Sequence, residues 1–342
     1  MATTFKPITT NDVSTTKTLL YEAIPMSGTI FSGTYSDNNV KNYSHGMFQS
    51  VYDYPYLSSS ANHIMDLTVG YSANSALSKS ASKQNDKKIN IYNQMAQILM
   101  GYDVTGSVLE FDRNMDKSLS GTKMKECIFI NYARLLTKDE IKKESYALTF
   151  HTGGTVQARS VEKLIKDYGA TTTFKNNTPA GEVGILYSGS DAVEDTGVGL
   201  VFYQAGIVVL TASIFTTQFG FPGSGEDTAS INTLLTGANI SASCDGIRNA
   251  WYDNLFNNTT ELNSAIYFAR VNHNEFNYSS NPTYLSASTI RVKNEKSDSP
   301  LSYITTVGLY STDNVLMAVA KLSEPLKKDP SNEFTLRVRL DY

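Results

Sequence analysis

The stretch FTLRVRLDY, residues 334–342, decides the fold class. Its side chains alternate strictly, with Phe334, Leu336, Val338, Leu340 and Tyr342 on one side and Thr335, Arg337, Arg339 and Asp341 on the other. A period of two predicts a β-strand with one buried face. Because the alternation continues to residue 342, we expect this end of the chain to be tied into a sheet.

Working outward, the preceding segments are also strand-like. Residues 303–310 (YITTVGLY) and 315–322 (VLMAVAKL) flank a polar turn at 311–314 (STDN), and a basic loop follows at 323–330 (SEPLKKDP). Further strands are expected at 128–135, 146–150, 183–187, 261–271 and 288–293, with a hairpin at 198–215, and short strand-like or irregular pieces at 24–35 and 45–56. Helices are expected at 86–100, 137–140, 160–168, 228–236 and 245–256. The sequence therefore predicts an α+β, predominantly β protein: an antiparallel sheet lobe with a few short helices and an inserted second β lobe.

Length and composition suggest how these elements are grouped. A chain of 342 residues exceeds the size at which one core usually keeps growing. Gly, Ser, Thr and Pro gather at 151–155 and 219–227, and loop-forming stretches of this kind often mark domain edges. We expect an N-terminal arm and helix (1–145) that packs with the C-terminal region, an inserted β lobe (146–226), and helices plus a C-terminal antiparallel sheet (227–342).

The charge pattern argues against several classes of protein. Only 18% of the residues are charged, the net charge is −4, and 21 tyrosines are present. The lysines of 79–88 come with Asp86 and no aromatic residue, so no nucleic-acid partner is expected. The apolar stretch 198–215 is interrupted by Gln204-Ala205-Gly206 and therefore predicts a hairpin, with no membrane spanning. Cys127 and Cys244 lack metal-binding spacing and are expected to remain thiols, and the N-terminus lacks the apolar region of a signal peptide.

Motifs for chemistry are weak throughout. Asp112, Asn114 and Asp116 alternate as in calcium loops, but Lys117 and Lys123 occupy the positions where such a loop needs Gly and a bidentate acid. The four histidines (His45, His63, His151 and His273) show no metal-ligand spacing, and His273 near Glu275 lacks a nucleophile partner.

Two other patterns also fall short of a catalytic or phosphate site. The acidic loop of Asp191, Glu194 and Asp195 could supply the carboxylates of a glycosidase, although loop acids usually stay solvated. The glycines Gly220, Gly223 and Gly225 lack the residues of a phosphate loop. We therefore predict no catalytic residues, no metal, no cofactor and no enzymatic activity.

Aromatic segments are the better candidates for binding. Tyr and Phe supply large contact areas at protein interfaces. The interface candidates are Tyr52, Tyr54, Tyr56, Phe276, Tyr278 and Tyr284. The same tyrosines could instead stack on sugars, or fill space between sheets.

Several phrases resemble a known family. They are FNYSSNPTY (276–284), YITTVGLY (303–310), LMAVAKL (316–322), RVRLDY (337–342), NYSHGMFQSVYDYPY (42–56) and INIYNQM (89–95). Together they are similar to virion structural proteins of contractile-tailed phages, especially myoviruses that infect marine cyanobacteria (cyanophages). The resemblance covers both ends of the chain, while residues 150–225 carry little of it.

The resemblance implies a non-enzymatic virion protein, with a baseplate or tail component favoured by the closing strand-turn-strand segment. Its partners would be other virion proteins and copies of itself in a symmetric assembly, put together in the cytoplasm of the host bacterium. Low charge and many Tyr, Asn, Ser and Thr residues suit surfaces that neighbouring subunits cover. The alternatives are a structural protein of the neck, head vertex or capsid surface, a glycan-binding or glycan-cleaving tail-tip protein, and a cytoplasmic accessory enzyme absent from particles.

Overall fold

The computed structural model describes residues 5–27, 38–79, 83–117, 122–154, 159–188, 197–215, 219–220, 228–229, 235–236, 239–278, 285–286, 289–290 and 300–342. The chain forms two compact units. Unit 1 combines Met1–Leu19 with Glu261–Tyr342, and unit 2 is Leu20–Thr260. The boundaries fall inside the two long strands β1 (Val13–Ser27) and β17 (Trp251–Val271).

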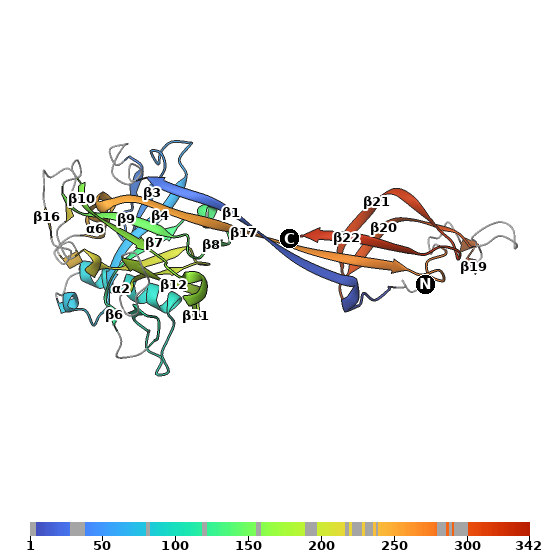
Figure 1. Ribbon diagram of the computed structural model, residues 1–342, viewed down its shortest axis with the longest axis horizontal. Helices are drawn as coiled ribbons and strands as arrows, with labels where there is room; N and C mark the ends of the chain where they lie inside the picture. The colour runs from blue at the N-terminus through green and yellow to red at the C-terminus, as the bar shows by residue number, and fades with distance from the viewer. Residues whose placement is uncertain are drawn as a thin grey trace. The chain divides into compact units, whose positions relative to one another are not determined.

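Unit 2 is built on one large antiparallel sheet (Figure 1). Its strand order is β17, β9, β10, β12, β13, β14, β7, β4, β3, β2, with β11 beside β12 and β8 beside β17. The bounds are β2 Val40–Asn42, β3 Gln49–Tyr52, β4 His63–Tyr71, β7 Glu126–Tyr132, β8 Glu140–Ile141, β9 Ala147–Gly154, β10 Arg159–Lys166, β11 Lys175–Thr178, β12 Gly181–Ser188, β13 Gly197–Phe202 and β14 Ile207–Thr211. The end of β1 also belongs to this unit, beside β17, and two small strand pairs are described as well: β5 Phe111–Asp112 with β6 Lys123–Met124, and β15 Phe219–Gly220 with β16 Thr228–Ala229.

Helices pack on the middle of this sheet. Both α2 (Lys83–Leu99) and α6 (Ile240–Ala250) lie against β4. The central strands β4, β7, β13 and β14 are almost entirely buried, so they read as apolar runs without clean alternation. The short helices are η2 Ala76–Lys79, α3 Arg134–Thr137, α4 Ala170–Thr173 and η3 Ala212–Ile214. Among the described residues, no helix combines the length and apolar character that crossing a membrane requires.

Unit 1 contains the C-terminal strands, drawn in red in Figure 1. Strand β22 (Phe334–Asp341) pairs antiparallel with β17, from Ser264 opposite Asp341 to Val271 opposite Phe334. β20 (Ser302–Tyr310) and β21 (Leu316–Lys328) form a hairpin, closed by the hydrogen bond from the Asn314 N–H to the Ser311 carbonyl. The remaining described elements of this unit are η1 Thr10–Asp12, β18 Leu285–Ser286 and β19 Thr289–Ile290.

The prediction from the closing stretch is confirmed along residues 334–341, whereas Tyr342, expected on the buried face, is exposed. Along β22 the even-numbered side chains are buried or half-buried and the odd-numbered ones are exposed. Tyr342 exchanges two backbone hydrogen bonds with Asn263, so this end of the chain is tied into the sheet. The mostly β character, the large antiparallel sheet, the hairpin at 198–215 and the helix over 86–100 also match the structure.

Several local predictions were wrong. Most of the segment 160–168 forms strand β10, which ends at Lys166, and not a helix, because it pairs with β9. The helix expected at 245–256 ends at Ala250, where β17 begins. The helical turn expected at 137–140 is α3, which ends at Thr137, and the loop expected at 323–330 is largely strand β21.

The unit boundaries differ from those expected at residues 145 and 226. Strands β9 to β14, which span the expected inserted lobe, join the same sheet as β7 and β17. The helix expected at 228–236 lies mostly outside the described residues, and Thr228–Ala229 forms a short strand.

Candidate interaction surfaces

The first surface lies on the β2–β3–β4 hairpins of unit 2. We call it the hairpin surface, and it consists of Tyr43, His45, Phe48, Tyr52, Tyr54, Tyr56 and His63. Three of its rings, Tyr43, His45 and Phe48, lie with centroids 4.9 to 5.1 Å apart. The Tyr52 ring lies 6.3 Å from Tyr56 and 5.5 Å from His63. Tyr54 is 48% exposed and Tyr56 36%, so the loop between β3 and β4 presents two aromatic side chains to solvent.

Polar groups hold that loop in place. The Asp53 carboxylate accepts hydrogen bonds from the backbone and side chain of Asn62, at 2.6 and 2.8 Å. The Tyr56 N–H donates to the carbonyl of Asn38, and the Asn39 side chain donates to the carbonyl of Tyr52. The tyrosines therefore stand on a braced loop rather than on a loose one.

His63 lies at the base of the loop. It pairs across the ladder with Tyr52, and its Nε2 is 2.9 Å from Asp66, which also accepts a hydrogen bond from Ser50 at 2.5 Å. The hydrogen bond to Asp66 raises the pKa of His63. Burial opposes ionisation of Asp66, but hydrogen bonds from His63 and Ser50 lower its pKa overall. Ser50 and His63 both bind the carboxylate, so the three residues lack the serine-to-histidine contact of a hydrolytic triad.

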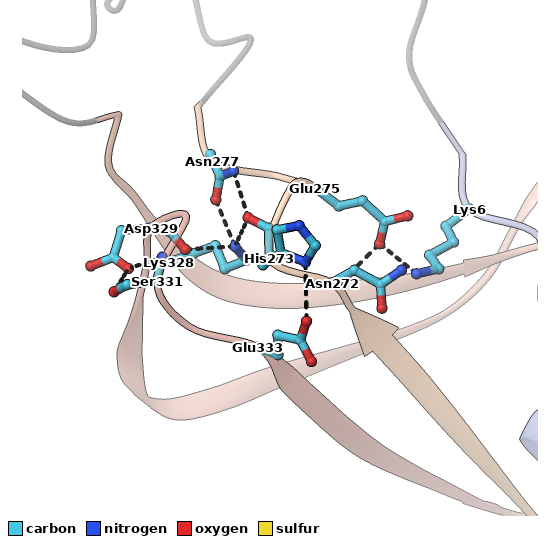
Figure 2. A network of polar contacts seen from close by, with 9 residues as sticks. All are labelled: Lys6, Asn272, His273, Glu275, Asn277, Lys328, Asp329, Ser331 and Glu333. Atoms are coloured by element: carbon cyan, nitrogen blue, oxygen red, sulfur yellow. Dashed lines mark hydrogen bonds and ion pairs between the residues drawn. The ribbon is translucent and has the colours of Figure 1, made fainter.

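The second surface lies in unit 1, on the turn that follows β17. We call it the turn surface, and it consists of Phe276, 43% exposed, and Tyr278, 52% exposed. Figure 2 shows the polar network of this turn. The ammonium of Lys328, a fully buried side chain, donates to the carbonyls of His273 (3.0 Å) and Asp329 (2.8 Å) and to Oδ1 of Asn277 (2.6 Å).

Other contacts brace the same turn. The Asn277 amide donates to the His273 carbonyl, and Ser302 donates to the carbonyl of Phe276. Glu275 accepts from the Asn272 N–H and pairs with Lys6. Phe276 has a φ of +53°, a left-handed conformation that costs a bulky residue about 1–2 kcal/mol. The network therefore holds an exposed aromatic side chain in a strained backbone position.

The predicted interface residues divide between these surfaces. Tyr52, Tyr54 and Tyr56 belong to the hairpin surface, with Tyr52 half-buried, and Phe276 and Tyr278 belong to the turn surface. Tyr284 lies outside the described residues. The sequence did not single out Tyr43, Phe48, His63 or Lys328 as parts of these surfaces. A β3–β4 hairpin register would have placed His63 beside Tyr52, but nothing local signals the burial of Lys328.

In the calcium-like loop, the first acid contacts a lysine. The Asp112 carboxylate is buried and lies 2.8 Å from the ammonium of Lys123, while the Asn114 amide donates to Asp116. Burial raises the pKa of Asp112, although Lys123 opposes the rise. Among the residues with described positions, no three His, Cys, Asp or Glu side chains gather as metal ligands would.

The remaining candidate groups pack inside the fold, lie in a short strand or fall outside the described residues. His151 packs edge-on against Tyr252. Cys127 and Cys244 are buried free thiols, and burial raises the pKa of each. Gly220 is in β15, whereas Asp191, Glu194, Asp195, Gly223 and Gly225 lie outside the described residues.

Among the described residues of unit 2, Asp167 is a buried acid with a strongly raised pKa. Asp167, 1% exposed, accepts hydrogen bonds from the N–H groups of Glu144 and Tyr146 and from the Tyr203 hydroxyl, at 2.7 to 3.0 Å. Burial raises its pKa to about 7. Near it, an open hollow of about 560 Å³ is lined by Lys142, Lys143, Glu144, Ser145, Thr171, Leu255 and Asn257. Lys143 pairs with Glu182, and Glu144 accepts a hydrogen bond from Thr171, so these charges are already engaged within the fold.

Comparison with known proteins finds no matching family model, no similar curated protein and no similar solved structure.

Proposed function

We propose that this chain is a non-enzymatic structural subunit of a virion. The observation that carries the proposal is the pair of braced aromatic surfaces, one in each unit. In each, hydrogen-bonded polar groups hold exposed rings in fixed positions. Aromatic side chains held in place supply binding energy with little further loss of conformational entropy, which suits permanent docking of neighbouring chains.

The kind of particle is suggested by the resemblance at both ends of the chain to virion proteins of contractile-tailed phages. On that basis the protein is a baseplate or tail component that holds neighbouring subunits in register. Its partners are copies of itself and other virion proteins. Part of the resemblance, NYSHGMFQSVYDYPY at 42–56, contains six of the seven hairpin-surface residues.

Ring geometry favours protein contacts over sugar stacking on the hairpin surface. Tyr43 and His45 stack on one another at 9°, so each covers one face of the other ring. Tyr52 is tilted by 41° to Tyr56 and by 61° to His63, so these rings do not form a flat platform. A glycan-binding tail-tip role would instead require Tyr54 and Tyr56 for adsorption even in fully assembled particles.

Mass spectrometry of purified phage particles, with tails and heads separated, tests the proposal. We expect the chain in the tail fraction. Recovery from the neck or head fraction would keep the structural role and move its position. Detection only in the lysate of infected cells, never in particles, would contradict the proposal.

A variant series tests the surfaces themselves. The double variant Tyr54→Ser/Tyr56→Ser should fold normally and lose incorporation into particles. Tyr102→Ser is the matched control, because Tyr102 is 52% exposed in unit 2 outside the hairpin surface. Equal incorporation of both variants would show that the hairpin surface is not a docking site.

A further inference from the structure

His63 is placed to control the loop that carries Tyr54 and Tyr56. The loop spans residues 53–62, and the cross-strand pair of Tyr52 and His63 closes its base. The ladder is irregular here, since Val51 pairs with Met65 and the next pair is Tyr52 with His63. A bulge weakens the backbone pairing at this point, so the contact between the Tyr52 and His63 rings contributes more to holding the loop closed.

The His63 ring is held from two directions. On β4, Asp66 lies 2.9 Å from Nε2, and from β3 the Tyr52 ring meets the imidazole edge-on at 61°. A protonated imidazole is stabilised by both neighbours. It forms a charge-assisted hydrogen bond to Asp66 and is attracted to the Tyr52 ring. A neutral imidazole keeps the hydrogen bond but loses both charge contributions.

The other ionisable groups nearby do not compete for this role. Burial, followed by the neighbouring Tyr43, raises the pKa of Tyr52, so the Tyr52 phenol stays neutral in the range where His63 titrates. The Lys41 ammonium lies over the Tyr43 ring, 4.9 Å from the ring centroid. Asp53 is bound by Asn62. Asp66 is therefore the one carboxylate that, among the described residues, contacts His63.

We propose that His63 is a proton-operated latch, whose protonated ring fastens the 53–62 loop to the β3–β4 ladder and so keeps the hairpin surface in its docking form. Asp66, on the same strand, orients the imidazole, and closing the loop brings the Tyr52 ring against it, which raises the affinity of the imidazole for a proton. By linkage, protonation then favours the closed loop. The raised pKa of His63 agrees with this direction. The regulatory meaning rests on the proposed function, but the latch itself does not.

Hydrogen–deuterium exchange of the isolated full-length chain tests the latch without any partner. The readout is the protection factor of the loop amides of Tyr56, Ser58 and Ala61, which donate to carbonyls in the folded loop. Protection factors are compared at pH 5.5 and pH 8.0 after correction for the intrinsic exchange rate. We expect greater protection at the lower pH in the native chain and loss of this step in His63→Gln.

His45→Gln is the matched control. His45 belongs to the same surface, but its Nδ1 accepts a hydrogen bond from the Met47 N–H and it has no carboxylate partner among the described residues. The control should keep the native pH step, and Asp66→Asn should lose it. Equal protection at both pH values in the native chain, or an unchanged step in His63→Gln, would overturn the latch. Neither result would bear on whether the chain is found in virions, so the two proposals can fail separately.

Discussion

At the scale of single residues, Lys328 shows how a charged side chain can organise a surface from beneath. Its ammonium is fully buried and meets three oxygen atoms, as a small cation would. An ammonium taken out of water is tolerated only when its donors are satisfied, so each of these contacts is needed. The turn surface therefore depends on a residue that no partner can touch.

Replacing Lys328 should destabilise the fold. Lys328→Met keeps the side-chain length but removes the donor to Oδ1 of Asn277 and to the carbonyls of His273 and Asp329, which should lower the free energy of unfolding by about 2–4 kcal/mol. Urea denaturation measures the loss. Lys321→Met is the matched control, since Lys321 is an exposed lysine on the same strand, and it should change stability by less than about 0.5 kcal/mol. Similar losses in both variants would show that the Lys328 contacts contribute no more to the free energy of unfolding than an exposed lysine does.

Replacing Phe276 should affect stability and function differently: stability should be kept while function is lost. Phe276→Gly removes the strain of a positive φ, so stability should stay level or rise by up to about 1 kcal/mol. The same change removes the exposed ring and should reduce incorporation into particles. Thermal denaturation and particle proteomics measure the two effects. A less stable variant that incorporates normally would mean that the ring serves the fold.

Asp167 predicts a specific dependence of stability on pH. Its folded pKa of about 7 lies above the ordinary 3.8, so between these values the folded state binds more protons than the unfolded state. The free energy of unfolding should therefore fall as pH rises through this window, by up to about 1.4 kcal/mol per pH unit. Asp167→Asn should be less stable in acid but should have a flatter profile from pH 4 to pH 7. Parallel profiles in urea titrations of the two chains would contradict this assignment.

At the scale of elements, the contact between α2 and β4 depends on a missing side chain. A Cβ on Gly70 would lie 2.7 Å from the Lys88 carbonyl and 3.0 Å from the Tyr92 nitrogen, both in the backbone of α2. The helix can approach the strand this closely only over glycine.

Gly70→Ala should force the helix and strand apart. Because backbone atoms cannot swing aside as a flexible side chain does, the cost should be about 1–3 kcal/mol in the free energy of unfolding. Chemical denaturation measures the cost, and amide exchange in α2 should increase. An unchanged denaturation midpoint together with unchanged amide exchange in α2 would show that the contact can accommodate an extra methyl group.

The sequence predicted elements well where one local pattern dominates. Strand β22 follows from alternation alone, and α2 follows from its apolar stripe and from Gly101 after its end. Strand β10 was missed because SVEKLIKDY fits a short helical stripe, and only its pairing with β9 decides otherwise. The same limit applies to the surfaces. The aromatic residues could be named from composition, but the contact of His63 with Asp66 and the burial of Lys328 come from tertiary folding.

At the scale of the whole molecule, each unit carries one braced aromatic surface. Unit 1 joins Met1–Leu19 to Glu261–Tyr342, so segments from both ends of the sequence contribute to one compact body. Under the proposed function, neighbouring subunits bind through either unit. Its low content of charged residues, 18%, reduces the desolvation cost of covering its surfaces.

A cryo-electron microscopy reconstruction of the intact phage particle tests the central claim most directly. We predict that the chain lies in the tail or baseplate, with Tyr54 and Tyr56 or Phe276 and Tyr278 buried against a neighbouring subunit. A particle in which both surfaces face solvent, or which lacks the chain altogether, would contradict the account.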